Sequence, residues 1–259
     1  DRLQRTWQFT ADAAVNSSPP PPVTTWKVKA LSLAACVLLG CFLLFSISGA
    51  EYSTGTNEHQ AIQLEDGSHV ELAAKTQLNI DFSEHQRTAN LHEGTAFFEI
   101  APDSQRPFTI KNQHAHIQVL GTAFEVEARR TSLRVHVQQG QVAVTHAQLG
   151  THHATKLKAG ESLHISNQPP HSVASYVPAD EVASWRKGKL IVKNTRVDAV
   201  IEKLKPYYSG VILLRDQQLA AHQVTGVFDL HNPQAALTAL VEPYGGQTRQ
   251  ITPWVLVID

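Results

Sequence analysis

Ile62-Gln-Leu-Glu-Asp-Gly-Ser-His-Val-Glu-Leu72 is the stretch that decides the fold of this 259-residue chain. Apolar and polar residues alternate on both sides of Asp66-Gly67, which is the pattern of two half-buried antiparallel strands joined by a tight turn. The sequence therefore predicts a β-hairpin here and a β-rich domain around it.

Short segments of the same kind continue along the chain to about residue 170, and no long helical pattern interrupts them. Gly94, Gly140 and Gly160 fall at the breaks between segments, where a positive φ is often needed. Many short, evenly spaced strands predict an antiparallel β-sandwich or roll. The predicted strands are Gln77–Phe82, Arg87–Glu93, Thr95–Ala101, Phe108–Lys111, His116–Leu120, Ala123–Ala128, Leu133–Gln138, Gln141–His146 and Ser162–Ser166.

The pattern changes after Gln168-Pro169-Pro170, which is interpreted as a linker. The segments that follow predict a small α+β domain in which a βαβ unit occurs twice. Its predicted elements are strands at Lys189–Val192, Val211–Leu214 and Gln223–Phe228, helices at Arg196–Lys205 and Pro233–Val241, and a closing hairpin of Gly246–Ile251 and Trp254–Ile258. It has no glycine-rich phosphate loop, so a docking role is favoured over a nucleotide site.

Ala30–Ser48 is an uncharged apolar run of a length that spans a bilayer, since 19 residues of helix rise about 28 Å. Trp26, Lys27 and Lys29 flank its N-terminal end, whereas no Lys or Arg follows until Lys75. The positive-inside rule then predicts a cytoplasmic N-terminus and an exported C-terminal body.

Three other interpretations of this run are weaker. A cleaved signal peptide ending near 46–48 would have an overlong apolar region. A lipoprotein signal at Leu38-Leu39-Gly40-Cys41 is disfavoured, because leucine fits poorly before the glycine. A buried core helix is also disfavoured, because such a helix should carry a polar stripe. A single-pass anchor is therefore expected.

The expected organisation has four parts: 1–25, a cytoplasmic remnant with a proline-rich linker; 26–49, the membrane helix; 50–170, the periplasmic β-domain; and 171–259, the small α+β domain. The chain has no methionine, so Asp1 is not an initiator and a preceding segment is expected. Cys36 and Cys41 both lie in the apolar run, so no disulfide supports the exported part.

The charge pattern argues against nucleic-acid binding, because the formal net charge is −1 and no basic run occurs. The sequence also lacks the common hydrolase, metalloprotease and nucleotide motifs. Ser184-Trp-Arg-Lys187 matches a Ser-x-x-Lys pattern, but its partner motifs are missing and it is interpreted as chance. No cofactor is expected.

Fourteen histidines raise the question of a metal site. His114 and His116 would lie on one face of a strand, and His152-His153 falls in a predicted loop. A closed zinc site needs four converging ligands, and the sequence does not locate a third or fourth. Polar surface histidines are the favoured interpretation, and no metal is predicted.

Several motifs occur together in a recognisable order, and in this they resemble the FecR-type transmembrane sigma-factor regulators. The match covers roughly Tyr52 to Ser166, and residues 189–259 resemble the small secretin and TonB N-terminal module through Val224–Phe228. The motifs are Thr54-Gly55-Thr56, Leu64–Leu72, Leu91–Ala101, Arg106-Pro107-Phe108, Val119–Val126 and Leu157–Gly160.

The resemblance implies an inner-membrane signal transducer. Its periplasmic part would sense a TonB-dependent outer-membrane receptor loaded with a siderophore or other iron ligand, and its cytoplasmic part would bind an extracytoplasmic-function sigma factor. That sigma-binding region is almost absent from this sequence. The alternative from another class is a membrane-anchored periplasmic scaffold or polymer-binding envelope protein with no sigma partner.

Two sets of site residues follow from the resemblance. Some family members cleave themselves within the Leu-Gly-Thr block, here between Gly121 and Thr122, by attack of the threonine hydroxyl on the glycine carbonyl; a tight strand junction is the structural alternative. The partner-binding candidates are Val224, Gly226, Phe228 and Asp229. Apart from possible self-cleavage, no enzymatic activity is expected.

Overall fold

The structure, a computed structural model, describes residues 50–147, 154–167 and 169–259. The predicted cytoplasmic remnant and the anchor at residues 30–48 lie outside these residues. Within the described part of the chain, no helix has the length and apolarity needed to cross a membrane. Residues 50–259 form one compact unit.

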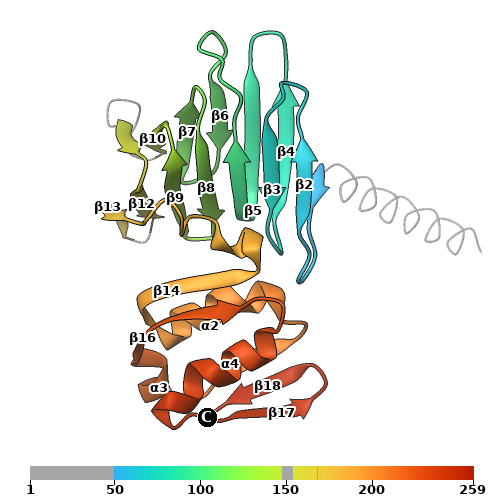
Figure 1. The fold of residues 1–259 in the computed structure, drawn as a ribbon, viewed down its shortest axis with the longest axis vertical. Helices are drawn as coiled ribbons and strands as arrows, with labels where there is room; N and C mark the ends of the chain where they lie inside the picture. The colour runs from blue at the N-terminus through green and yellow to red at the C-terminus, as the bar shows by residue number, and fades with distance from the viewer. Residues whose placement is uncertain (1–49, 148–153, 168) are drawn as a thin grey trace, which may run out of the picture. The chain divides into compact units, whose positions relative to one another are not determined.

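The described chain is mainly β, with 51% strand and 16% helix, as the alternating pattern predicted. Its larger portion, residues 50–176, is a sandwich of two sheets joined through the long strand β5 (Figure 1). The first sheet pairs β1, β4, β5, β6, β7, β10 and β11, and the second pairs β2, β3, β5, β8, β9, β12 and β13. Their bounds are β1 Tyr52–Ser53, β2 Gln60–Gln63, β3 His69–Leu72, β4 Gln77–Phe82, β5 Arg87–Glu99, β6 Phe108–Lys111, β7 Ala115–Val119, β8 Ala123–Ala128, β9 Ser132–Gln139, β10 Gln141–His146, β11 Ala154–Lys158, β12 Glu161–Asn167 and β13 Pro170–Tyr176.

The predicted hairpin is confirmed as β2 and β3, which pair antiparallel around the Asp66-Gly67 turn. Gly67 has a φ of 82°, a conformation that glycine adopts without strain. Asp66 accepts hydrogen bonds from the Ser68 amide at 2.9 Å and the Ser68 hydroxyl at 2.8 Å. Local turn chemistry therefore determines this part of the fold.

The break predicted at Gly94 is wrong, because the strand segments predicted on either side of it are the two halves of one strand, β5. Gly94 has a φ of 101°, and a Cβ there would lie 2.4 Å from Thr76 Cα. Thr76 donates to the Thr95 carbonyl and accepts from the Thr95 amide, each at 3.0 Å. The glycine thus admits the crossing backbone while β5 continues from one sheet into the other.

Three strands of the sandwich, the two-residue β1 together with β11 and β13, were not predicted. β13 pairs antiparallel with β12, with Asn167 opposite Pro170, so the segment interpreted as a linker connects two paired strands. The Pro169-Pro170 pair suggested a linker, but proline is also tolerated at the start of an edge strand. β13 therefore extends the sandwich to Tyr176.

One continuous apolar core lies between the two sheets. The rings of Phe98 and Phe124 stack within it with their centroids 5.5 Å apart, and the centroids of Phe98 and Phe108 are 6.2 Å apart. Each strand contributes alternate residues to this core, as the period of two requires. The opposite residues of the second sheet form a polar outer face.

The connector, residues 177–188, leads from β13 to the C-terminal module, residues 189–259. The connector ends in a short 3₁₀ helix, η2 (Ser184–Lys187). The module contains β14 Lys189–Arg196, α2 Val197–Leu204, η3 Lys205–Tyr207, β15 Val211–Leu214, α3 Gln217–Ala221, β16 Gln223–Asp229, α4 Pro233–Val241, η4 Glu242–Tyr244, β17 Thr248–Thr252 and β18 Val255–Ile258.

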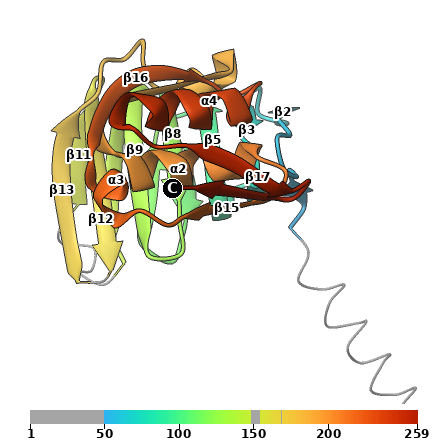
Figure 2. The ribbon, with the colours of Figure 1, turned by 90° about the horizontal axis from the view of Figure 1, so that it is seen from below.

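The α+β class is confirmed for this module, including β15 and α4 at the predicted bounds. The predicted repeat of a βαβ unit is wrong, because the strands before and after each of α2 and α4 lie in different sheets. β14 pairs with β16, and β18 lies between β15 and β17. Helices α2 and α4 contribute to a second apolar core with side chains from both small sheets, and Figures 1 and 2 show the two helices beside these strands. Short α3 was missed, because five residues are too few for a periodic signal.

Candidate functional site

The outer face of the second sheet carries a straight row of side chains supplied by four neighbouring strands. The register places Glu71 of β3 opposite Phe97 of β5, Phe97 opposite Glu125 of β8, and Glu125 opposite His136 of β9. Cross-strand partners on one face lie about 5 Å apart. Two carboxylates, one aromatic ring and one imidazole therefore form a continuous strip.

The connector covers this strip with two consecutive side chains of η2. The Trp185 indole N–H donates to Glu125 Oε2 at 2.7 Å. The Arg186 Nε donates to Glu71 Oε1 at 2.7 Å, and its guanidinium lies 4.1 Å from the centroid of the Phe97 ring. One turn of 3₁₀ helix thus binds most of the row through a hydrogen bond, an ion pair and a cation–π contact.

A second carboxylate, Glu127, lies two residues further along β8 and is surrounded by cations. Arg129 Nε contacts it at 3.0 Å, Arg134 Nη1 at 3.5 Å and Lys203 Nζ, from α2 of the module, at 3.8 Å. Burial alone would raise the pKa of Glu127, but the charges of Lys203, Arg129 and Arg134 lower it to about 2. Glu127 is therefore ionised throughout the physiological range.

Glu125 behaves in the opposite way, although it lies on the same face of the same strand. Burial, followed by repulsion from Glu127, raises the pKa of Glu125 to about 7. Burial also lowers the pKa of His136 to about 4. Because both groups are mainly neutral at pH 6, the 3.9 Å approach of His136 Nε2 to Glu125 Oε1 is a contact between neutral groups there, not an ion pair.

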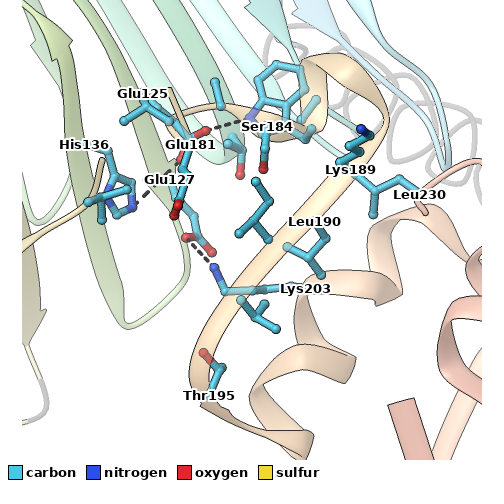
Figure 3. Close-up of a pocket in the computed structure, with 18 of the residues that line it drawn as sticks. Glu125, Glu127, His136, Glu181, Ser184, Lys189, Leu190, Thr195, Lys203 and Leu230 are labelled. Carbon is cyan, nitrogen blue, oxygen red and sulfur yellow. Dashed lines mark hydrogen bonds and ion pairs between the residues drawn. The ribbon is translucent and has the colours of Figure 1, made fainter. Parts of the chain in front are cut away.

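A cavity of about 300 Å³ opens beside these residues, between the sandwich, the connector and the module. Figure 3 shows Glu125, Glu127 and His136 reaching it from the sandwich strands and Lys203 reaching it from α2. The phenol of Tyr207 also lines it, and burial raises the pKa of that group. The arrangement can hold one exchangeable proton, on Glu125, close to neutral pH.

The cavity is not recognisable as a metal centre. Across residues 50–147, 154–167 and 169–259, no group of three or more His, Cys, Asp or Glu side chains could hold an ion. His114 is buried, and its ring contacts the Arg129 carbonyl and the Asn167 side-chain amide, each at 2.8 Å. His116 is exposed on β7, and His152-His153 lies outside the described residues.

Gly121 and Thr122, the candidate self-cleavage pair, lie between β7 and β8, away from this cavity. Thr122 is buried and its hydroxyl donates to the Gln141 carbonyl at 3.0 Å. A Cβ on Gly121 would approach Pro102 to 2.9 Å, so glycine is required for the close packing. The carbonyl orients the hydroxyl but cannot remove its proton, and self-cleavage stays a prediction.

The four partner-binding candidates all lie on β16 but do not share one face. Val224 is buried in the module's core and Phe228 packs against that core, with Gly226 on the same side. Asp229 is exposed and accepts from the His231 amide at 2.9 Å. A partner on the other face of β16 would meet Val227, which is 61% exposed. The partner-binding role of the four residues stays a prediction.

The sequence prediction did not identify the Glu125, Glu127, His136 and Trp185 cluster. Ser184–Lys187 was singled out only as a chance Ser-x-x-Lys match, yet this segment is η2 and supplies Trp185 and Arg186 to the junction. The available signal was two glutamates that alternate with buried residues on β8. Alternation places them on the outer face, but only the register brings His136 and the connector to them.

Comparison with known proteins agrees with this architecture. The family model described as "FecR protein" matches residues 50–143. A candidate anti-sigma factor from Parabacteroides distasonis ATCC 8503 has a similar fold in two crystal structures, both 26% identical and covering 80% of this chain. They have TM-scores of 0.73 and 0.72 and are covered over 97% and 96% of their own lengths. No curated protein matches the chain significantly.

These similarities define the class. Residues 50–143 of the sandwich match the FecR family model, and the predicted resemblance to FecR-type anti-sigma regulators is confirmed. The structural match extends over most of the chain, beyond the part that the family model covers.

Proposed function

We propose that this protein is a single-pass inner-membrane signal transducer that regulates an extracytoplasmic-function sigma factor. Its N-terminus lies in the cytoplasm and the sandwich and C-terminal module lie in the periplasm. It responds to a TonB-dependent outer-membrane receptor that has bound an iron siderophore. The match to the FecR family together with the fold of a candidate anti-sigma factor carries this proposal.

The membrane topology is supported by the sequence of residues 26–48. An uncharged run of bilayer length follows Lys27 and Lys29, so the rule of cytoplasmic positive charges orients it. A signal received outside the membrane must then reach the sigma factor through one helix. Fusion of a reporter enzyme to the C-terminus would test the orientation, which is wrong if the reporter is active only in the cytoplasm.

The C-terminal module is the proposed docking site for the receptor's periplasmic signalling domain. β15 is an edge strand of the three-stranded sheet, and its uncharged sequence exposes Val211 and Leu213. Trp254 is also exposed, one residue before the partner of Val211 in β18. An apolar, unblocked edge suits addition of a strand from a partner.

The sigma partner is tested with the full-length protein from its native host. Co-purification should retain a sigma factor, and deletion of the regulator should change transcription of that factor's target promoter. Recovery of the intact protein without a sigma factor, combined with an unchanged promoter, would overturn the proposal in favour of the envelope-scaffold alternative.

The docking role has a matched pair of variants. Val211→Asp places a charge on β15, whereas Val173→Asp places it on β13 of the sandwich, at a valine of nearly equal exposure, 54% against 52%. A pull-down with the receptor's periplasmic domain should lose binding by about tenfold or more with Val211→Asp alone, because a desolvated charge opposes strand addition. Equal binding by both variants, or unchanged binding after deletion of Lys189–Asp259, contradicts this assignment.

Self-cleavage at Gly121-Thr122 would convert this protein into two associated fragments. The threonine hydroxyl would attack the Gly121 carbonyl carbon, the amide nitrogen would leave as an amine, and water would hydrolyse the resulting ester. Thr122→Ala should abolish the fragments on a denaturing gel and Thr122→Ser should retain them. The same fragments from the alanine variant would exclude this chemistry.

A further inference from the structure

The junction between the sandwich and the C-terminal module combines a small apolar cluster with several polar contacts. The sandwich and the module have separate apolar cores. Between them lies a cluster of Phe97, Val182 and Ala183, and Trp185 packs against both this cluster and the module core. Because only three residues are buried in this cluster, the stability of the junction also depends on the state of its charges.

Besides the Val177 amide, which donates to the Gly160 carbonyl at 2.8 Å where β13 ends, five polar contacts between described residues cross this junction. They are Trp185 with Glu125, Arg186 with Glu71, Lys203 Nζ with Glu127 at 3.8 Å, the Asn57 amide with the Pro206 carbonyl at 3.0 Å, and the Gln138 side-chain amide with the Ala179 carbonyl at 3.2 Å. Trp185 also meets the His59 ring edge-on at 5.4 Å. The connector therefore contributes three of these contacts and the module two.

We propose that the junction is a charge-controlled latch, in which the Trp185–Glu125 and Arg186–Glu71 contacts hold the module against the sandwich and ionisation of Glu125 releases it. Such a release frees the connector while both cores, including α2 in the module core, stay folded. The inference concerns the exported part alone and does not depend on the identity of the sigma factor or the receptor.

The surroundings of Glu125 explain why its ionisation opposes closure. The Glu125 side chain is only 11% exposed, so its charge would lose most of its contact with water. The titratable groups that share its cavity include Glu127 on β8, Arg129 after β8, His136 on β9, Glu181 of the connector, Lys189 and Lys193 on β14, Lys203 on α2 and Tyr207 on η3. Arg129, Arg134 and Lys203 contact Glu127, and no Lys or Arg of the described residues forms an ion pair with Glu125. The charge of Lys203 offsets the cost of burying Glu125 only in part.

The direction of the pH effect follows from the raised pKa of Glu125, about 7 instead of 4.5. A carboxyl whose pKa is raised in the closed state favours closure fully below about pH 4.5. It loses that contribution as the pH rises through 7. If opening restores the ordinary pKa, linkage makes the open fraction rise about tenfold between pH 6 and pH 8.

Hydrogen exchange measured by mass spectrometry on the full chain in detergent tests the latch locally. The readout is the exchange rate in peptides from residues 177–188, divided by the intrinsic rate at each pH, and peptides from α2 report on the module core. Peptides from β5 and β10 report on the core. Trp185→Phe removes one hydrogen-bond donor, and Trp254→Phe makes the same change at an indole that is 70% exposed and serves as the control.

We expect Trp185→Phe to speed exchange in the connector about tenfold, as expected for loss of a buried hydrogen bond, and Trp254→Phe to leave it unchanged. Glu125→Gln, which keeps an acceptor for Trp185, should abolish the increase between pH 6 and pH 8. Arg186→Glu should open the junction, and Glu71→Arg in the same chain should restore part of the protection.

Three results would overturn the latch. One is equal exchange in the two tryptophan variants. Another is a corrected wild-type rate in the connector that does not change between pH 6 and pH 8. The third is simultaneous loss of protection in β5 and β10, since the junction would then unfold with the core instead of opening by itself.

Discussion

At the scale of single residues, the hydrogen bonding of a turn is tied to the interior of the sandwich. Asp66 not only shapes the β2–β3 turn but also contacts Arg87 Nη1 at 2.8 Å, and the exposed fractions of the two side chains are 7% and 1%. Arg87 in turn donates to the Arg106 carbonyl at 2.7 Å and the Ala101 carbonyl at 3.1 Å. The hairpin motif and the Arg106-Pro107-Phe108 motif therefore meet at one buried guanidinium.

Replacing Asp66 by Asn should destabilise the protein by about 3–5 kcal/mol, because Arg87 would be left as a buried and uncompensated charge. Although burial raises the pKa of Asp66, hydrogen bonds from Ser68 and Arg87 lower it overall. The carboxylate therefore adds stability above its ordinary pKa of 3.8, and this is lost as the pH falls through the lower folded value. Urea unfolding at pH 7 and at pH 3 should show the variant and wild type converging in acid.

Asp103→Asn is the control for this prediction. Asp103 contacts Arg106 at 3.0 Å, but these side chains are 25% and 43% exposed, so its loss should change stability by less than about 1 kcal/mol. Equal effects of the two substitutions would show that the buried pair contributes no more than a surface one.

At the scale of elements, β5 decides how the two sheets are joined. Its first residues pair with β4 and β6, and its last residues pair with β3 and β8. The strand changes sheets near Gly94, where the backbone of Thr76 approaches. Sequence periodicity found both halves of β5 but interpreted the glycine as a break, because periodicity does not report what lies against a residue.

Gly94→Ala should destabilise the protein by about 3 kcal/mol or more, since a Cβ combines an unfavourable φ with a clash against backbone. Gly67→Ala is the matched control: its φ is also positive, at 82°, but a Cβ there meets nothing within 4 Å. It should lose only about 1–2 kcal/mol from the left-handed conformation. Chemical unfolding of both variants separates the cost of the positive φ from the cost of the Cβ clash. If Gly94→Ala lowers the free energy of unfolding no more than Gly67→Ala does, the close approach of Thr76 to β5 is contradicted.

At the scale of the whole molecule, two apolar cores are joined by a polar junction. The residues of the sandwich core all precede Ser166, and those of the module core all follow Lys189. Glu125 and Glu127 lie on one strand, and the assembled junction shifts their pKa values in opposite directions. Neither the sandwich nor the module produces both shifts alone.

A chain that stops after Tyr176 should therefore keep a folded sandwich. Its far-UV circular dichroism should stay β-type, and core peptides of β5 should stay protected from hydrogen exchange. Without the connector and module, Glu125 becomes exposed to water, and its pKa should return toward the ordinary value of about 4.5. Loss of the β signal on truncation would instead show that the module is part of the sandwich's folding unit.

The sequence by itself determined the β-rich class, the Asp66-Gly67 hairpin, most strand positions, the amphipathic helix α2 and the proline-started helix α4. These depend on local periodicity and turn chemistry, which neighbouring residues carry. It did not reveal the continuity of β5, the pairing of β13, or the row from Glu71 to His136. Only the tertiary structure decided these features, because strand register and the path of the connector bring together side chains that are distant in the sequence, such as Glu71 and Arg186, which are 115 positions apart. The raised pKa of Glu125 and the lowered pKa of Glu127 have the same origin, since both depend on burial and on cations supplied by distant segments.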